Sequence, residues 1–383
     1  MSRSDIVIPI QVNAHNLSTP LSSVPSPEPS PLSTDAIIHH RDDAQELKAE
    51  GSWLWEQFSY LVYLTVFGIF GVLTRYGLQK LFGPEGVGAT KDKYYMYLDL
   101  PSNMVGSFLM GWFGVVFKAN ISCVSDQLAV GLTTGYLGSL TTFSGWNQKM
   151  LELGAEGEWV FVVLGYFIGL FLVAYSIIFG VETAQGFKWT LRKLSTSSQP
   201  GHFRSRSSLK ADSSKIPVVV TVVLLVVVVL FYCLSGSLEW KEINKGGSRA
   251  QLLLACMVGP LGVWTRWFLA KKLNGQGLGK NGFLKWLPFG TLTANVFAAC
   301  VMALFAILKK AVNTQNFDTV AGGIQLGLMG CLSTVSTFIA EFHTMRESDQ
   351  PWRAYAYAMV TILASFILGT LIYSVPFWIN NYD

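Results

Sequence analysis

Apolar runs about 20 residues long recur along the chain, separated by short polar segments. As a helix, a run of this length crosses a bilayer core of roughly 30 Å. Backbone groups in hydrocarbon must be hydrogen-bonded within their own segment, so helices are the expected spanning elements. The pattern predicts an all-α membrane protein with nine transmembrane helices near 57–82, 98–117, 128–148, 159–182, 217–236, 250–272, 286–308, 321–343 and 354–379.

Two segments depart from the general pattern. Residues 1–50 are polar and serine-rich, with prolines at 20, 25, 27, 29 and 31, which predicts a disordered cytoplasmic tail. The run at 217–236 consists of valine and leucine from Val218 to Leu230, apart from Thr221. Because this run offers almost no polar group to a pore, we interpret it as a spacer helix.

Composition narrows the class of protein. Of the 383 residues, 51% are hydrophobic and 14% are charged, whereas soluble domains carry roughly 25% charged residues. The mean hydropathy of +0.39 argues against a soluble globule or a disordered chain. The net charge of +4 is too small and too scattered for a phosphate-reading surface, so we expect no nucleic-acid partner.

Basic residues in short loops predict the orientation. The strongest cluster lies between the fourth and fifth runs, which places that link in the cytoplasm. Four crossings precede the link, so the N-terminus is expected in the cytoplasm and the C-terminus outside. Lys309 and Lys310 fall on the opposite side, so the rule is obeyed only on balance. The cluster is Lys188, Arg192, Lys193, Arg204, Arg206, Lys210 and Lys215.

The most informative feature is an internal repeat. Three motifs recur at an offset of 191 or 192 residues. They are Gly-x-x-x-Arg ending at Arg75 and Arg266, an asparagine at Asn103 and Asn295, and a glycine-plus-hydroxyl segment at Gly138–Ser144 and Gly330–Ser336. The chain is therefore expected to hold two four-helix units, 57–182 and 250–379, joined by a linker over 183–249.

The spacer helix gives the repeat a geometry. Four crossings return the chain to its starting side, so one additional crossing turns the second unit upside down. The expected result is an inverted pair related by a pseudo-two-fold axis in the membrane plane. Functional sites are then expected near the midplane, between the repeats.

The first two motifs each allow two interpretations. Arg75 and Arg266 are either interfacial anchors or the cations of a vestibule that attracts anions. Asn103 and Asn295 either join helices or donate N–H groups to a passing anion.

The third motif points to a broken helix. A glycine and a cluster of hydroxyl groups weaken helical pairing and leave backbone carbonyls available at mid-membrane. Two such breaks that meet at a pseudo-two-fold axis suit a single cation in a ring of carbonyl oxygens.

Taken together, these motifs resemble the fluoride channel family. Its bacterial members are dual-topology dimers of four-helix subunits. Its eukaryotic members, the fluoride exporters, fuse two such units through one extra helix. The resemblance covers about 57–379, and the third-helix motif is its most specific part.

The resemblance implies roles for individual positions. Asn103 and Asn295 would line the fluoride path, and fluoride would meet aromatic edges at Phe143 and Phe338. A polar track would follow along the last helix, and backbone carbonyls of the two breaks would hold a central structural sodium ion. The track is Tyr357, Thr361 and Ser365, and the sodium positions are Gly138, Thr141, Gly330 and Ser333.

Two departures suggest that the pores are unequal. In the bacterial dimers each pore takes its first aromatic residue from one unit and its second from the other. Phe143 and Phe338 would complete one pore here, whereas Val335 and Trp146 would leave the other without its phenylalanines. We therefore hypothesise one working pore and one vestigial pore. The glutamate that follows the family motif is Glu341, but its first-unit counterpart is Lys149, and the sequence assigns neither a role.

The resulting expectation is a passive fluoride-selective channel in the plasma membrane, functional as a monomer, that confers fluoride resistance. The membrane potential, worth about 2.3 kcal/mol per charge per 100 mV, would expel the anion without energy coupling. The alternative is a proton- or cation-coupled transporter of a small anion, which usually needs an ionisable group at the midplane. No spacing typical of a catalytic triad or metal site emerges, so an enzyme is not expected.

Overall fold

The computed structural model describes residues 35–90, 96–117, 125–197, 215–242, 247–275, 284–380 and 382. The chain divides into a unit of residues 1–53 and a unit of residues 54–383. Helix α1 (Asp35–Phe82) begins inside the stretch expected to be disordered, and residues 1–34 of that stretch lie outside the described residues. Beyond Pro31 the sequence up to residue 50 has no proline or glycine and several good helix formers, which favours this early start.

The second unit contains only helical elements among its described residues. In the first repeat α1 is followed by α2 (Leu100–Trp112), η1 (Phe113–Phe117), α4 (Asp126–Val130), η2 (Gly131–Leu137), α5 (Gly138–Leu140), α6 (Phe143–Ala155) and α7 (Trp159–Ser197), where η marks a π-helical segment. Helix α8 (Lys215–Glu242) leads to α9 (Ser248–Leu273), α10 (Phe289–Val312), α11 (Gln315–Ile324), η3 (Gln325–Met329), α12 (Gly330–Leu332), α13 (Ser336–Arg346), α14 (Trp352–Gly369), η4 (Thr370–Ser374) and α15 (Val375–Asn380).

Seven helices within the described residues are long and apolar enough to cross a membrane. They coincide with seven of the nine predicted spans. The predicted spans 98–117 and 128–148 are not among them. The first is the short pair α2 and η1, and the second runs over α4, η2, α5 and α6 with a break after α5; the counted span 321–343 has the matching break after α12.

Both third-helix motifs interrupt the helix at the predicted places. Thr141 is extended, with φ −102° and ψ 146°, and Ser333 is extended, with φ −81° and ψ 159°. Helices α6 and α13 restart two or three residues later. Each interruption follows a π-helical segment, η2 or η3, so the two repeats share the local distortion as well as the break.

The first helices of the two repeats pack side by side and antiparallel. Lys271 near the end of α9 donates to Gln57 near the start of the apolar part of α1, at 2.7 Å. Further along, the indole of Trp264 donates to the Leu61 carbonyl at 3.2 Å. The contact continues where Val72 of α1 lies beside Gly259 of α9.

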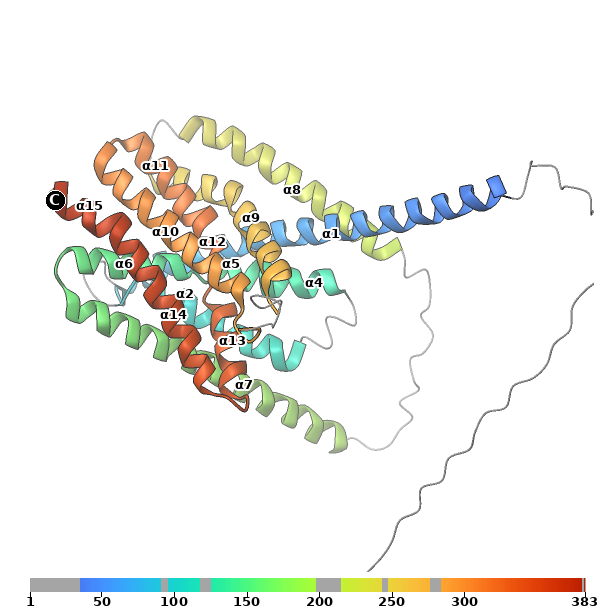
Figure 1. Cartoon of the computed structure of the whole chain (residues 1–383), viewed down its shortest axis with the longest axis horizontal. Helices are drawn as coiled ribbons and strands as arrows, with labels where there is room; N and C mark the ends of the chain where they lie inside the picture. Colours follow the sequence, from blue (N-terminus) through green and yellow to red (C-terminus); the bar gives the residue numbers. More distant parts are fainter. Residues whose placement is uncertain are drawn as a thin grey trace, which may run out of the picture. The chain divides into compact units, whose positions relative to one another are not determined.

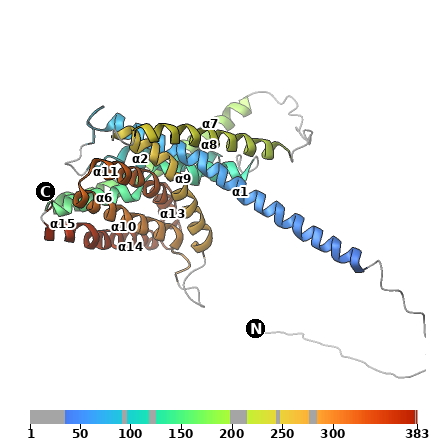
Figure 2. The same cartoon turned by 90° about the horizontal axis from the view of Figure 1, so that it is seen from above.

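The halves of the broken helices exchange partners between repeats. Helix α6 packs on its own neighbour α7 and also on α10 and α14 of the second repeat. Helix α13 packs on α14 and also on α2 and α7 of the first. Helices α10 and α14 lie side by side in both views (Figures 1 and 2). Residues from both repeats therefore form one shared core.

Helix α8 differs from these helices. Only 11% of its most apolar window is buried, and it packs mainly on α9 (Figure 1). Valine side chains cover its exposed surface, as at Val219 and Val223. This exposure agrees with the predicted role of a spacer that faces lipid.

Candidate functional site

Each repeat holds its helix break with one asparagine. In the first repeat the Asn103 side chain accepts from the Thr142 backbone N–H at 2.8 Å and donates to the Thr142 carbonyl at 3.1 Å. In the second repeat Asn295 makes the same two bonds to Thr334, at 2.8 and 3.1 Å. Both asparagines are fully buried. The amide thus replaces the helical partners that the extended backbone has lost.

Hydroxyl groups join the two breaks directly. The Ser333 hydroxyl lies 3.0 Å from that of Thr142 and accepts from the Ser144 backbone N–H at 3.1 Å. The counterpart Thr141 hydroxyl accepts from the Ser336 backbone N–H at 3.0 Å. All these groups are buried, so each break is completed by the other repeat.

These bonds free four backbone carbonyls from their helical partners. In a continuous helix Gly138 would accept from the N–H of residue 142, but that N–H bonds to Asn103. Thr141 would accept from the N–H of Gly145, which bonds instead to the Thr142 hydroxyl at 3.3 Å.

The second repeat repeats this rearrangement. The N–H of residue 334, which would serve Gly330, bonds to Asn295, and the N–H of Thr337, which would serve Ser333, bonds to the Thr334 hydroxyl at 3.4 Å. Within the described residues no group of three His, Cys, Asp or Glu gathers as a metal site. The groups that the breaks offer are neutral backbone oxygens, the ligand type of a hard cation, and the Arg266 and Arg75 guanidiniums lie against two of these positions, Gly138 and Gly330.

Each arginine reaches the break of the opposite repeat. Arg266 donates to the Thr134 carbonyl in η2 at 2.8 Å, and Arg75 donates to the Leu326 carbonyl in η3. A Cβ atom on Gly138 would overlap the Arg266 guanidinium, and one on Gly330 would overlap that of Arg75.

The arginines are 1% and 3% exposed, and in each the Nε and Nη1 atoms have no hydrogen-bond partner among the residues that the structure describes. Both are therefore buried between the repeats. Each guanidinium uses Nη2 for its one bond to a π-helical carbonyl.

The aromatic residues form one connected row. The Phe143 and Phe338 rings lie 6.1 Å apart, and Phe338 meets Tyr357 edge-on at 5.1 Å. On the other side Phe143 meets Trp146 edge-on at 5.8 Å. The residues that the sequence analysis paired across the repeats, Phe143 and Phe338, are thus brought together. Val335 is also fully buried, in the same apolar cluster.

Beyond Phe338 the row continues into polar groups. The Tyr357 hydroxyl donates to Glu341 at 2.8 Å, and the Thr291 hydroxyl donates to the same carboxylate at 2.7 Å. Thr361 is buried but donates to its own helix, at the Tyr357 carbonyl. The Ser365 hydroxyl is buried and has no partner within the described part of the chain. The predicted track is therefore buried along α14, with Glu341 at one end.

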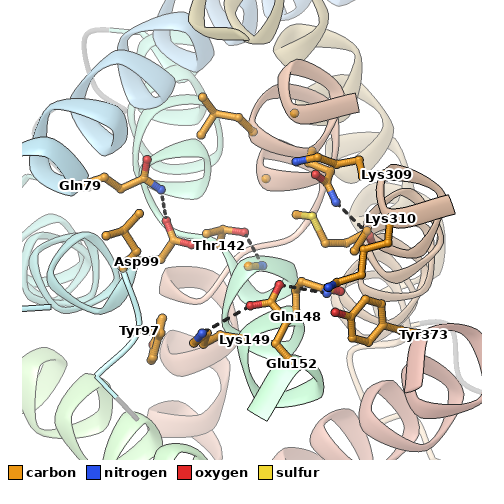
Figure 3. Close-up of a pocket in the computed structure, with 18 of the residues that line it drawn as sticks. Gln79, Tyr97, Asp99, Thr142, Gln148, Lys149, Glu152, Lys309, Lys310 and Tyr373 are labelled. Carbon is orange, nitrogen blue, oxygen red and sulfur yellow. Dashed lines mark hydrogen bonds and ion pairs between the residues drawn. The ribbon is translucent and has the colours of Figure 1, made fainter. Parts of the chain in front are cut away.

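A cavity of about 580 Å³ lies beside the first break (Figure 3). Its wall combines Asp99 at the start of α2 with Lys309 and Lys310 at the end of α10, and it includes Arg75 and Lys149. In Figure 3 Gln79 is bonded to Asp99, and Lys149 points toward Glu152, 3.5 Å away. The cavity mixes cations with carboxylates, and it contains Arg75, one of the two arginines for which a vestibule was one of two interpretations. Arg266 does not line it.

Several residues of the site have no predicted role. Thr142, Thr334, Ser144 and Ser336 complete the breaks, and all four lie inside the repeated motif, so their common offset is the signal that could have found them. Tyr97 bonds to Asn103 at 3.1 Å and lies outside every repeated motif.

Comparison with known proteins yields one family model that matches twice. The model described as "CrcB-like protein, Camphor Resistance (CrcB)" covers residues 62–181 and 253–373. Similar proteins include the fluoride-specific ion channel FluC of Geotalea uraniireducens, 32% identical over 34% of this chain and 90% of that protein. Another is FluC 2 of Listeria monocytogenes serovar 1/2a, 36% identical over 29% of this chain and 81% of that protein. No solved structure matches.

Proposed function

The chain belongs to the CrcB-like protein family, and from this premise we propose that it is a passive fluoride channel that exports cytosolic fluoride and confers fluoride resistance. It is a multi-pass membrane protein in which the family domain occurs twice. The observation that carries the proposal is the buried contact between Phe143 and Phe338, one ring from each repeat, beside the paired helix breaks. Aromatic ring edges carry positive potential, so such a pair suits a small anion that has shed its water.

We further propose nine crossings and two inverted repeats. The antiparallel contacts of α1 with α9 support the inversion. The cavity wall supports it as well, because the start of α2 and the end of α10, the corresponding helices of the two repeats, meet there. Helix α8 supplies the additional crossing that inversion requires. Together with the basic link before α8, this topology puts the N-terminus in the cytoplasm and the C-terminus outside the plasma membrane. A test is to fuse a reporter that works only in the cytoplasm after residue 383. Activity of this fusion would overturn the topology.

A sodium ion between the breaks is the proposed structural cofactor. The carbonyls of Gly138, Thr141, Gly330 and Ser333 would hold it, since their helical donors are engaged elsewhere. Bound there, the ion would neutralise the negative ends of the half-helices. Asn103, Asn295 and the hydroxyl groups of Thr142 and Thr334 keep these carbonyls available, because they bond to the N–H groups that would otherwise pair with them. The proposed role of the ion is structural.

One working path follows from the aromatic row. We propose that fluoride passes the Phe143–Phe338 pair and then the track of Tyr357, Thr361 and Ser365. Asn103 and Asn295 are the proposed amide donors on the fluoride path. Weak ligands in series allow the anion to leave as readily as it enters. With both pores inside one chain, a single copy is sufficient for function, so we propose that the monomer is the active form.

The geometry also favours a second candidate, a coupled transporter. Glu341 is an ionisable group that is hydrogen-bonded to Tyr357 of the track, and proton-coupled carriers use groups of this kind. The two functions differ in one measurement. For a channel the reversal potential follows the fluoride gradient alone, whereas for a proton-coupled carrier it moves with the pH gradient.

The decisive experiment is fluoride efflux from liposomes that hold the purified full-length chain, followed with a fluoride-selective electrode. We expect rapid efflux once a cation ionophore relieves the membrane potential, and no comparable loss of chloride. Chloride efflux as fast as fluoride efflux, or the absence of fluoride efflux from correctly folded protein, would contradict the proposal.

A further inference from the structure

The buried face of α14 that carries the polar track continues beyond Ser365. Gly369, four residues further on, ends α14, and Tyr373, after another four, lies in η4. Both are buried, and Tyr373 forms part of the wall of the cavity of about 580 Å³ (Figure 3). Four-residue steps drift around an α-helix by about 40° each, and the wider turn of a π-helix offsets part of this drift at η4. One face of the last helices therefore leads from the track to the cavity.

Asn147 of α6 meets this face between the track and the cavity. Its side-chain nitrogen donates to the Ser365 carbonyl at 3.5 Å and would lie 3.3 Å from a Cβ atom on Gly369. The next residue along α6, Gln148, lines the cavity, and so does Tyr373 one turn beyond Gly369. The amide of Asn147 is thus placed beside the last step of the path, where Ser365 ends the series of hydroxyl groups.

The polar groups at this step retain hydrogen-bonding capacity. The Tyr166 hydroxyl donates to Asn147 Oδ1 at 2.7 Å, which occupies the acceptor of the amide. Of the two amide N–H groups, one makes the long bond to Ser365, and the other has no partner among the residues described. Asn147 and Ser365 are both fully buried. The unused N–H group and the Ser365 hydroxyl are therefore available only to a group that enters the path.

The second repeat has no amide at the corresponding place. The residue 192 positions after Asn147 is Ile339, which is also fully buried. Helix α13 therefore packs in the same broken-helix arrangement with an apolar side chain there. Packing of the repeat does not require the amide, whereas a path for an anion gains from it, because an amide supplies two N–H groups in place of water.

We infer that Asn147 is a further ligand of the conducted anion, which it meets after Ser365 and before the cavity. Its N–H groups take over from the Ser365 hydroxyl and pass the ion to the cavity, whose wall also carries Lys149 and Lys309. In the proposed topology the end of α10 lies outside, so this step is the exit of fluoride. A neutral amide holds the anion weakly, which allows fast release. The inference rests on the proposed function, because it names a ligand on the same path.

The test removes the amide without leaving an unpaired group. Tyr166→Phe is the background, because it deletes the hydroxyl that bonds to Asn147, and Asn147→Leu is then added. Replacing both partners of a hydrogen bond by apolar groups of similar shape is close to neutral for folding. The double variant should therefore unfold at the same denaturant concentration as Tyr166→Phe alone. We expect its fluoride efflux from liposomes to be at least tenfold slower than that of this control.

A purely structural amide predicts a different result. If Asn147 only joins α6 to α7 and α14, the folded double variant should conduct like the Tyr166→Phe control. A loss of less than tenfold in protein that unfolds cooperatively would therefore overturn the inference. If the double variant does not fold, Asn147→Ile replaces Asn147→Leu in the same background, because isoleucine is the side chain that the second repeat carries at this place. The same criterion then applies.

The same assay separates this inference from the proposed function. Wild-type efflux and its loss in Phe338→Ile test the channel and its working path. If both hold and the Asn147 variants conduct like their control, only the role of Asn147 fails. If the wild-type chain does not conduct fluoride, the proposed function itself fails.

Discussion

In the first repeat Asn103 binds both backbone groups of Thr142, and in the second Asn295 binds Thr334 at the same two distances. Near the path the repeats diverge. Trp146 stacks on Tyr97 and lies against Gly169, whereas Phe338 meets Tyr357 edge-on and Phe143 at a tilt.

The difference shows which positions depend on the other repeat. Each break is completed by hydroxyl groups and an arginine from the opposite repeat, so a change on one side damages both. The aromatic positions differ between the repeats, since Val335 stands where the first repeat has Phe143, and Trp146 where the second has Phe338. The proposed loss of one path would therefore leave the bonds that complete the breaks unchanged.

We expect the largest loss of fluoride efflux from substitutions at the aromatic pair. Phe338→Ile should lower fluoride efflux by about 100-fold, equivalent to roughly 2.7 kcal/mol, because an aliphatic side chain has no electropositive edge. Phe143→Ile should have the same effect, since one ring comes from each repeat. Trp146→Phe should change efflux by less than about threefold, within 0.7 kcal/mol. Equal sensitivity at all three positions in the liposome assay would refute the asymmetry of the paths.

A second experiment tests the symmetry of the scaffold. Gly138→Ala and Gly330→Ala each place a methyl group where an arginine of the other repeat lies. Overpacking of this kind costs roughly 1–3 kcal/mol, and we expect the two variants to lose similar stability.

Gly77→Ala is the matched control for these variants, because a Cβ atom on Gly77 meets no atom within 4 Å. It should leave the free energy of unfolding unchanged or raise it by up to about 1 kcal/mol. Denaturation in detergent micelles measures all three. A loss confined to one repeat would contradict the reciprocal contacts.

Removal of sodium should act on both repeats through one shared site. Replacing sodium by N-methyl-D-glucamine should lower the midpoint of thermal unfolding, because an ion present at 100 times its Kd stabilises the folded state by about 2.7 kcal/mol. Potassium at the same ionic strength controls for screening. Identical midpoints in all three salts would speak against a sodium ion at the breaks.

The smallest expected effect concerns two tyrosine hydroxyls. Tyr357→Phe removes the donor to Glu341, and a hydrogen bond contributes roughly 0.5–1.5 kcal/mol net, so we expect efflux to fall by about two- to tenfold. Tyr166→Phe removes a hydroxyl that donates to Asn147 at 2.7 Å in the first repeat, and it should leave efflux unchanged. Stopped-flow efflux resolves the difference. A larger loss in Tyr166→Phe would place the working path in the first repeat.

The sequence by itself determined the repeat and the places where the third helices break. A constant offset identifies paired motifs, and a glycine followed by hydroxyl residues cannot hold a regular helix in hydrocarbon without other partners. Apolar length alone also predicted seven spans that form long helices. It did not reveal that span 98–117 is the short pair α2 and η1, because hydropathy averages over the local backbone.

Only the tertiary structure decided how the paired motifs are used. Arg75 and Arg266 were open to two interpretations, and their bonds to the opposite repeat depend on contacts between residues that lie more than 130 positions apart. Tyr97 belongs to no repeated motif, yet it takes the amide of Asn103 and the face of Trp146. A periodic pattern records which face of a helix is apolar. It does not record which donor meets which acceptor once two helices are packed together.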